Sequence, residues 1–227
     1  MKHPIVLVMS GIDGSGKSTI AKAMAKHLSK KGFATNIIWF RWRALLLYIV
    51  YFISRVKGLY RSVRLLNGRN VRIHLTEADK ALATLYSYVL LLDLIIFYFL
   101  QRVVNYFKNV VIYDRSPLDA LIDVYYIRYR SGLRLGNLIL KLYLSFALRI
   151  TKCIIVLDAT EDVILARKRD IVSLREIVFK RRLYNALSRA LGLPLIDTSN
   201  RDIASTLKDV LAHVKTSTGY RGSLGLV

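Results

Sequence analysis

A run of residues near the start of the chain has the types and spacing needed to hold phosphate. It reads G-I-D-G-S-G-K-S-T over 11–19, which matches G-x-x-x-x-G-K-[ST]. Glycines in such a loop let backbone N–H groups face the anion. Lys17 is predicted to bridge the β- and γ-phosphates of ATP, and Ser18 to ligate Mg²⁺. The residues predicted to bind ATP are Gly11, Gly14, Ser15, Gly16, Lys17, Ser18 and Thr19.

A second group of reactive residues follows the apolar run V-V-I-Y. Asp114, Arg115 and Ser116 stand where this predicted strand ends, and ligands of open α/β sheets bind at the carboxyl ends of the strands. Asp114 is predicted to hold Mg²⁺ through water or to orient the acceptor. Arg115 is predicted to clamp a phosphate with two parallel hydrogen bonds. The alternative is an ordinary helix-capping aspartate beside a surface arginine.

Two later segments complete the candidate site. A-R-K-R-D places three cations after a strand–helix unit, where a mobile lid over about 166–176 would bring Arg167 and Arg169 to the transferring phosphoryl group. The alternative is a solvated basic face. L-P-L-I-D-T-S-N, at 193–200, ends the last predicted strand with a polar turn and is a candidate edge for an adenine ring.

These residues must be positioned by alternating strands and helices. Five short apolar runs read as strands, and each lies between segments of helical character, which is typical of βαβ units and a parallel sheet. The predicted strands are 5–9, 33–40, 109–113, 152–157 and 193–196. The predicted helices are 17–31, 42–57, 77–107, 118–130, 135–150, 161–170, 174–191 and 201–214.

Two apolar stretches test whether the chain is soluble. Residues 81–100 are long enough to span a membrane. Asp93, near the middle, costs about 2.5–3.5 kcal/mol on insertion scales, so a buried core helix is the better interpretation. Residues 44–53 are too short to span. Arginine and lysine flank them, so they either pack inside or lie on a membrane surface.

Charge and composition narrow the class of protein. The chain has 227 residues and a net charge of +21, and thirteen Lys or Arg but no Asp or Glu fall between Asp13 and Glu77. Such a field attracts nucleotides, nucleic acid or anionic membranes. The single cysteine, Cys153, excludes a disulfide framework. The first residues lack a signal peptide's apolar region. A cytoplasmic protein is therefore expected, with one domain over 1–214 and a loose tail over 215–227.

The order of these motifs resembles the thymidylate kinase family. The phosphate loop, V-V-I-Y-D-R-S about a hundred residues later, the arginine lid and K-R-R-L-Y before L-P-L-I-D-T all follow in sequence. The resemblance implies a three-layer α/β fold with a five-stranded parallel sheet flanked by helices. It also implies transfer of the γ-phosphate of ATP, with magnesium, to a nucleoside monophosphate.

The resemblance also assigns roles to individual residues. Asp13 would meet the 3′-hydroxyl of the acceptor sugar. Arg41 and Arg115 would hold the acceptor phosphate. Ser15 occupies the loop position where some members carry an arginine, so Arg167 and Arg169 would supply the transition-state cations from the lid.

The chain departs from the family's pattern where the base is recognised. The family usually carries a phenylalanine and an arginine on the helix before the Asp-Arg strand. Counting back from Asp114, those places fall near Leu90 and Leu94, with Asp93 between them as a candidate substrate ligand. If the count is wrong by a helical turn, Tyr86 or Tyr88 would supply the aromatic ring.

Three functions therefore follow from the sequence. The first is a thymidylate-kinase-like enzyme that converts dTMP to dTDP. The second is a related kinase whose acceptor is a deoxynucleoside, or a lipid- or sugar-linked phosphate at a membrane surface. The third is an ATP-binding module that contacts nucleic acid through its basic face. The sequence leaves open whether the protein forms a homodimer.

Overall fold

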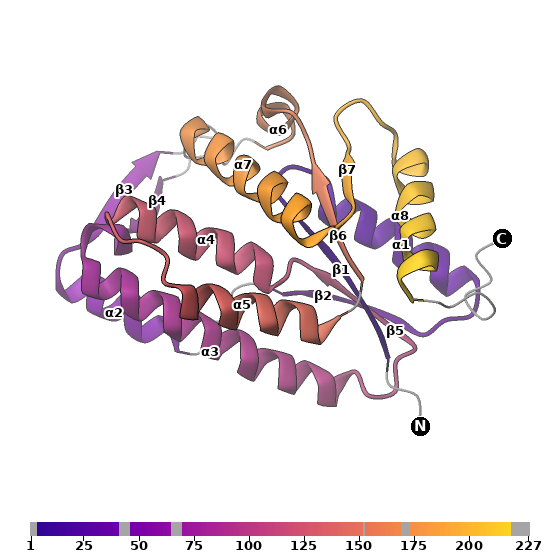
Figure 1. Cartoon of the computed structure of the whole chain (residues 1–227), viewed down its shortest axis with the longest axis horizontal. Helices are drawn as coiled ribbons and strands as arrows, with labels where there is room; N and C mark the ends of the chain where they lie inside the picture. Colours follow the sequence, from indigo (N-terminus) through magenta and orange to yellow (C-terminus); the bar gives the residue numbers. More distant parts are fainter. Residues whose placement is uncertain (1–3, 41–45, 65–69, 152, 169–172, 219–227) are drawn as a thin grey trace.

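A parallel sheet forms the middle of three layers in the computed structural model, which describes residues 4–40, 46–64, 70–151, 153–168 and 173–218 (Figure 1). Its strand order is β2-β5-β1-β6-β7, and all neighbouring strands are parallel. The strands are β1 (Ile5–Gly11), β2 (Thr35–Trp39), β5 (Val110–Asp114), β6 (Cys153–Asp158) and β7 (Leu195–Asp197). This confirms the predicted fold class and all five predicted strands, within a few residues at their ends.

The central strands are apolar because helices cover both faces of the sheet. Every residue of β5 and β6 is buried, as expected for strands without a solvent-facing side. Side chains of β1 alternate between the two faces: Leu7 and Met9 belong to one hydrophobic core and Val8 to the other. The register pairs Met9 with Asp114 and Gly11 with Leu157. The carboxyl ends of β1, β5 and β6 therefore lie side by side at one end of the sheet.

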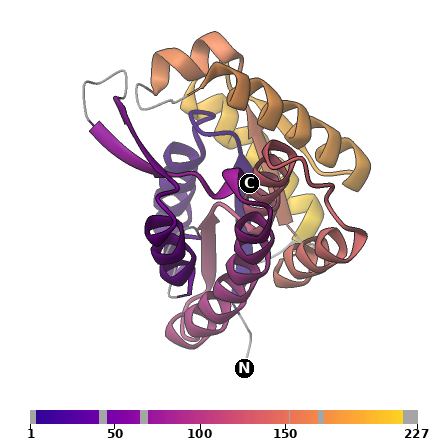
Figure 2. The same ribbon diagram turned by 90° about the vertical axis from the view of Figure 1, so that its left-hand side faces the viewer.

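Two helical layers enclose the sheet (Figure 2). One contains α1 (Lys17–Lys30) and α8 (Ile203–Thr218), which pack on the core that includes Met24 and Val210. The other contains α2 (Leu47–Val56), α3 (Lys80–Val104), α4 (Pro117–Arg130) and α5 (Asn137–Ile150). Short α6 (Glu161–Arg167) leads to α7 (Leu174–Leu191), which packs against α4 through Phe179, whose ring stacks on Tyr129 at 4.9 Å.

The region between α2 and α3 differs from the prediction. An antiparallel hairpin, β3 (Tyr60–Arg64) and β4 (Asn70–His74), was not predicted, and a short 3₁₀ helix, η1 (Thr76–Ala78), follows it. Helix α3 begins at Lys80 instead of 77, because the Asp79 side chain caps it by accepting the Leu82 N–H at 3.0 Å. At the other end of the chain, α8 continues four residues beyond the predicted domain boundary at 214.

Helix α3 has two different sides. It is the one helix of the described residues that is long and apolar enough to cross a membrane, yet 44% of its apolar window is buried inside the fold. Leu82, Tyr86 and Leu90 point into the core on one side. The prediction of a core helix is therefore right for that side, and the other side remains apolar and exposed.

Candidate active site

The phosphate loop joins the end of β1 to the start of α1. Gly11 has φ +134°, and a Cβ there would lie 2.0 Å from the carbonyl oxygen of Leu157 on the adjacent strand. Gly16 caps α1 in the left-handed region with φ 88°, which glycine adopts without steric cost. The loop therefore leads directly into a helix N-terminus, where backbone N–H groups bind phosphate.

Lys17 is buried inside this loop. Its side chain is 4% exposed, and Nζ donates to the carbonyl oxygens of Gly11 and Ile12, each at 2.6 Å. Burial, with the nearby Arg115 cation, lowers the pKa of Lys17 to about 8, although carboxylates including Asp119 and Asp13 oppose the shift. A triphosphate would offer this ammonium anionic phosphate oxygens in place of the two carbonyl oxygens.

Ser18 and Asp114, the two predicted magnesium ligands, lie together. The Ser18 hydroxyl donates to the Asp114 carboxylate at 2.5 Å, because the pairing of β1 with β5 places Asp114 beside the loop. Hydroxyl and carboxylate oxygens suit Mg²⁺, which usually completes its shell with water and substrate phosphates. No group of three or more His, Cys, Asp or Glu that could hold a metal occurs among the described residues. A metal here would therefore depend on the nucleotide's own oxygens.

Asp13 is held by cations from three elements. Its carboxylate forms ion pairs with Arg115 and with Lys168, the latter at 3.1 Å, and lies 3.8 Å from Lys17 Nζ. Arg115 has φ 86°, rare for a residue with a side chain, and its N–H donates to the Met9 carbonyl at 2.9 Å. Its Nε is buried and has no hydrogen-bond partner within the described part of the chain. Strained backbone of this kind concentrates at functional sites.

Arg167 forms a side wall of the site. Its guanidinium donates to the Thr198 hydroxyl at 3.0 Å, the Thr198 carbonyl at 2.8 Å and the Gly14 carbonyl at 3.4 Å. It thereby links α6, the phosphate loop and the segment after β7 predicted to border an adenine ring. Arg41 and Arg169, the other two predicted cations, lie outside the described residues, as does part of the predicted lid.

These parts line one cleft of about 530 Å³. The phosphate loop forms its floor, and the start of α8 forms the wall beside Thr198. Lys168 and Arg201 add positive charge at its border. Its lining includes Asp13, Gly14, Gly16, Lys17, Ser18, Thr19, Arg115, Arg167 and Thr198. The volume and the convergent cations suit a nucleotide.

Asp93, predicted as a substrate ligand, does not line this cleft. It is 5% exposed, and its two carboxylate oxygens accept the backbone N–H groups of Leu46 and Leu47, each at 2.9 Å. The carboxylate thus caps α2, whose first N–H groups have no partner in the helix. Leu90 and Leu94, expected near the base of the acceptor, lie on the inner side of α3, in the core that α3 shares with α2.

Sequence reasoning missed Asp119, a buried residue behind the phosphate loop. Its carboxylate accepts hydrogen bonds from the hydroxyls of Ser10 at 2.6 Å, Ser116 at 2.9 Å and Tyr184 at 2.7 Å. It also accepts the Gly11 N–H at 3.3 Å. Asp119 therefore ties β1, the start of α4 and α7 to the loop. The local signal was the spacing S-P-L-D, which forms a capping box.

Comparisons with known proteins show which solved structures share the fold of this chain. No protein-family model matches the chain, and no curated protein matches its sequence. Thymidylate kinase from Candida albicans is similar in structure at 14% identity, with a TM-score of 0.57 over 94% of this chain and 92% of that one. Thymidylate kinase from Ehrlichia chaffeensis gives 14% identity and a TM-score of 0.55 over 94% and 100%.

A third solved structure is a deoxyadenosine kinase from M. mycoides with bound dATP. It is 14% identical and has a TM-score of 0.53 over 93% of this chain and 99% of that one. The protein has a P-loop kinase fold. The resemblance predicted from the order of the motifs thus extends to the arrangement of the whole chain in space.

Proposed function

We propose that the protein is an ATP- and magnesium-dependent phosphotransferase. The observation that carries the proposal is the convergence of Lys17, Ser18 and Asp114 at the carboxyl end of the sheet. Lys17 and Ser18 line a cleft that is bordered by further cations, and Asp114 accepts the Ser18 hydroxyl beside it. Phosphoryl transfer requires mainly positioning and neutralisation of charge. This constellation supplies both.

Each residue has a defined task in this proposal. The N–H groups of the loop and of α1 would hold the β- and γ-phosphates, and Lys17 would exchange its carbonyl partners for phosphate oxygens. Ser18 and Asp114 would hold Mg²⁺, which would neutralise the triphosphate. Arg115 would orient the acceptor phosphate, and Arg167 would fix the wall against which the nucleotide lies.

For the acceptor, we propose a nucleoside monophosphate first, with dTMP as the leading candidate. The structural similarity to two thymidylate kinases supports this class. A deoxynucleoside is the second candidate, supported by the similarity to the deoxyadenosine kinase. In that case Asp114 would accept the proton of the attacking hydroxyl.

A screen of ATP consumption tests the activity. Purified protein is incubated with ATP and Mg²⁺ and with each nucleoside monophosphate and deoxynucleoside, and ADP is measured. Lys17→Ala should abolish turnover, because losing such a charge costs roughly 3 kcal/mol or more of transition-state stabilisation. Lys22→Ala, an exposed lysine on the same helix, is the matched control and should keep normal turnover. Equal activity of the two variants would show that Lys17 and its loop take no part in the reaction.

A further inference from the structure

The outer side of α3 carries an uninterrupted apolar stripe. Its members are Leu85, Tyr88, Leu92, Ile96, Phe99 and Val103, all among the exposed large hydrophobic residues. They follow one another at intervals of three or four residues, so they share one side of the helix. Leu82, Tyr86, Leu90 and Leu94 occupy the opposite side, inside the core. The stripe is therefore available for contact without disturbing the fold.

Helix α2 extends this surface. It lies beside α3 (Figures 1 and 2) and exposes Tyr48, Phe52 and Val56. At about 200 Å² for each large side chain, the exposed fractions give on the order of 1,000 Å² of apolar area on the two helices together. Soluble monomers rarely expose apolar patches above a few hundred Å². We refer to these nine residues of α2 and α3 as the apolar face.

The segment of the sequence that contains α2 and α3 is strongly basic. Residues 41–108 contain eleven Lys or Arg and three Asp or Glu. Asp93 is buried as the cap of α2, and Asp79 is paired with Lys57. Exposed cations in this region include Arg55, Arg61, Lys80, Arg102 and Lys108. An apolar surface bordered by cations is complementary to the headgroups and acyl boundary of an anionic bilayer.

We propose that the apolar face of α2 and α3 docks the protein onto an anionic phospholipid surface. A second copy of the chain fits less well, because apposing two such faces would bring two basic fields together. Helix α3 lies in the interface and does not cross the bilayer, since its inner side covers the sheet and its Asp93 holds α2.

Docking of this kind leaves the nucleotide cleft accessible. The cleft is lined by the phosphate loop, α1 and the start of α8. Helices α1 and α8 cover one face of the sheet, and α2 and α3 cover the other. ATP would therefore enter from the aqueous side while the opposite layer contacts lipid.

Vesicle sedimentation tests the proposal with the full chain. Vesicles of phosphatidylglycerol should bind the protein, and vesicles of phosphatidylcholine should bind it at least tenfold less. Raising NaCl from about 0.05 M to about 0.5 M should weaken the binding, because salt screens the basic border. The double variant Phe52→Glu, Phe99→Glu should lose at least tenfold in vesicle partitioning. Leu174→Glu, an exposed apolar residue on α7, is the matched control and should bind like the unmodified chain.

Three results would overturn the proposal. Absence of binding to any vesicle is the first. The second is equal binding by the double variant and the control, once circular dichroism shows that both are folded, because charge alone would then explain the attraction. The third is a dimer in light scattering that the double variant converts to a monomer, with no vesicle binding, because the apolar face would then be an interface between two copies.

Discussion

Gly11 illustrates how a single backbone position constrains the whole site. A Cβ at this residue would lie 2.0 Å from the Leu157 carbonyl oxygen of β6, closer than real atoms approach. The positive φ adds strain for any residue with a side chain. The first glycine of the loop is thus required both for the turn and for the close packing of β1 on β6.

Gly11→Ala is expected to lower the free energy of unfolding by about 2–4 kcal/mol and to weaken ATP binding at the same time. Gly132→Ala is the control, because Gly132 also has a positive φ but no atom lies within 4 Å of the point that its Cβ would occupy. Gly132→Ala should lower the free energy of unfolding by about 1 kcal/mol, which is the cost of the backbone strain alone. Urea denaturation of both variants measures the difference, and equal costs would contradict the steric argument.

Asp93, predicted as a substrate ligand, caps α2 in the structure. Removing its carboxylate in Asp93→Ala would leave the Leu46 and Leu47 N–H groups without their acceptor. We expect a loss of about 1–2 kcal/mol in unfolding free energy, with KM for the acceptor unchanged at a temperature where the variant is folded. A large increase in that KM without loss of stability would restore the original prediction of a substrate ligand.

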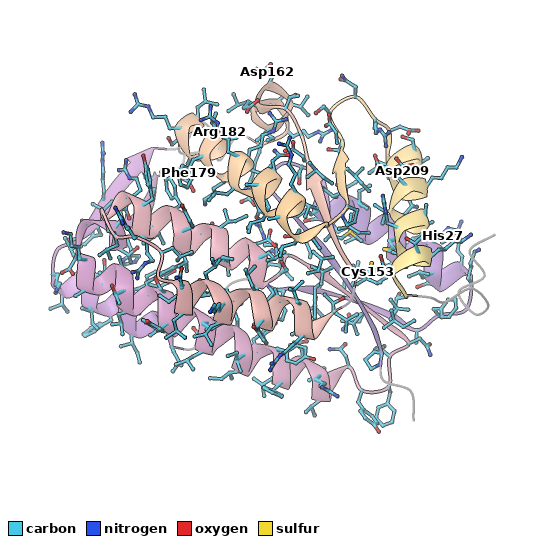
Figure 3. All side chains as sticks on the ribbon, in the orientation of Figure 1. His27, Cys153, Asp162, Phe179, Arg182 and Asp209 are labelled. Carbon is cyan, nitrogen blue, oxygen red and sulfur yellow. The ribbon has the colours of Figure 1, made fainter. Side chains whose placement is uncertain are left out.

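Among the elements, α6 and the segment after β7 act together through Arg167. Its guanidinium donates to Thr198 and to the Gly14 carbonyl. Arg167→Ala would remove these two or three charge-assisted hydrogen bonds. We therefore expect this variant to bind ATP about tenfold more weakly, or weaker still. Arg182, an exposed cation on the outer side of α7 (Figure 3), provides the control variant Arg182→Ala. Isothermal titration with ATP measures both. Equal affinities of the two variants for ATP would mean that this side of the cleft forms without Arg167.

The strands and the phosphate loop could be predicted because their signals are local. Short β-branched runs bounded by glycine or charge mark each strand, and the loop's spacing is characteristic by itself. The hairpin β3–β4 was missed although N-V-R-I in its second strand alternates polar with apolar residues. Its short, charged strands lack the apolar content by which the other strands were recognised.

The Asp119 network could not be predicted from sequence for a different reason. Asp119 and Tyr184 are 65 residues apart, and they meet only because α7 packs across α4. Similarly, the sequence places Leu90 and Leu94 on the long helix before β5 but does not tell which of its sides faces the core. Side-chain direction on a long, nearly uniformly apolar helix is decided by tertiary packing, which periodicity alone does not reveal.

At the scale of the molecule, the sheet separates the two proposed binding surfaces onto opposite faces. The layer of α1 and α8 borders the nucleotide cleft, and the layer of α2 and α3 carries the apolar face with its basic border. A rigid sheet between them fixes the distance from the cleft to any docked surface.

The single thiol reports on the integrity of this sheet. Cys153 lies at the start of β6, is 2% exposed (Figure 3), and its burial raises the pKa of the thiol to about 11. At pH 8 only about one native thiol in a thousand would be ionised, compared with roughly a quarter for an ordinary cysteine. Ellman's reagent should therefore react slowly with the folded protein and rapidly, with one thiol per chain, in guanidinium chloride.

Below the raised pKa the thiolate fraction grows about tenfold for each pH unit. Raising the pH from about 8 to about 9 should therefore speed the native reaction by that factor, as long as the sheet opens and closes faster than the thiol reacts. A rate that is already fast at pH 8 would show that the strand is accessible to solvent. Such a result would contradict the packing of α8 over β6, on which the separation of the two faces depends.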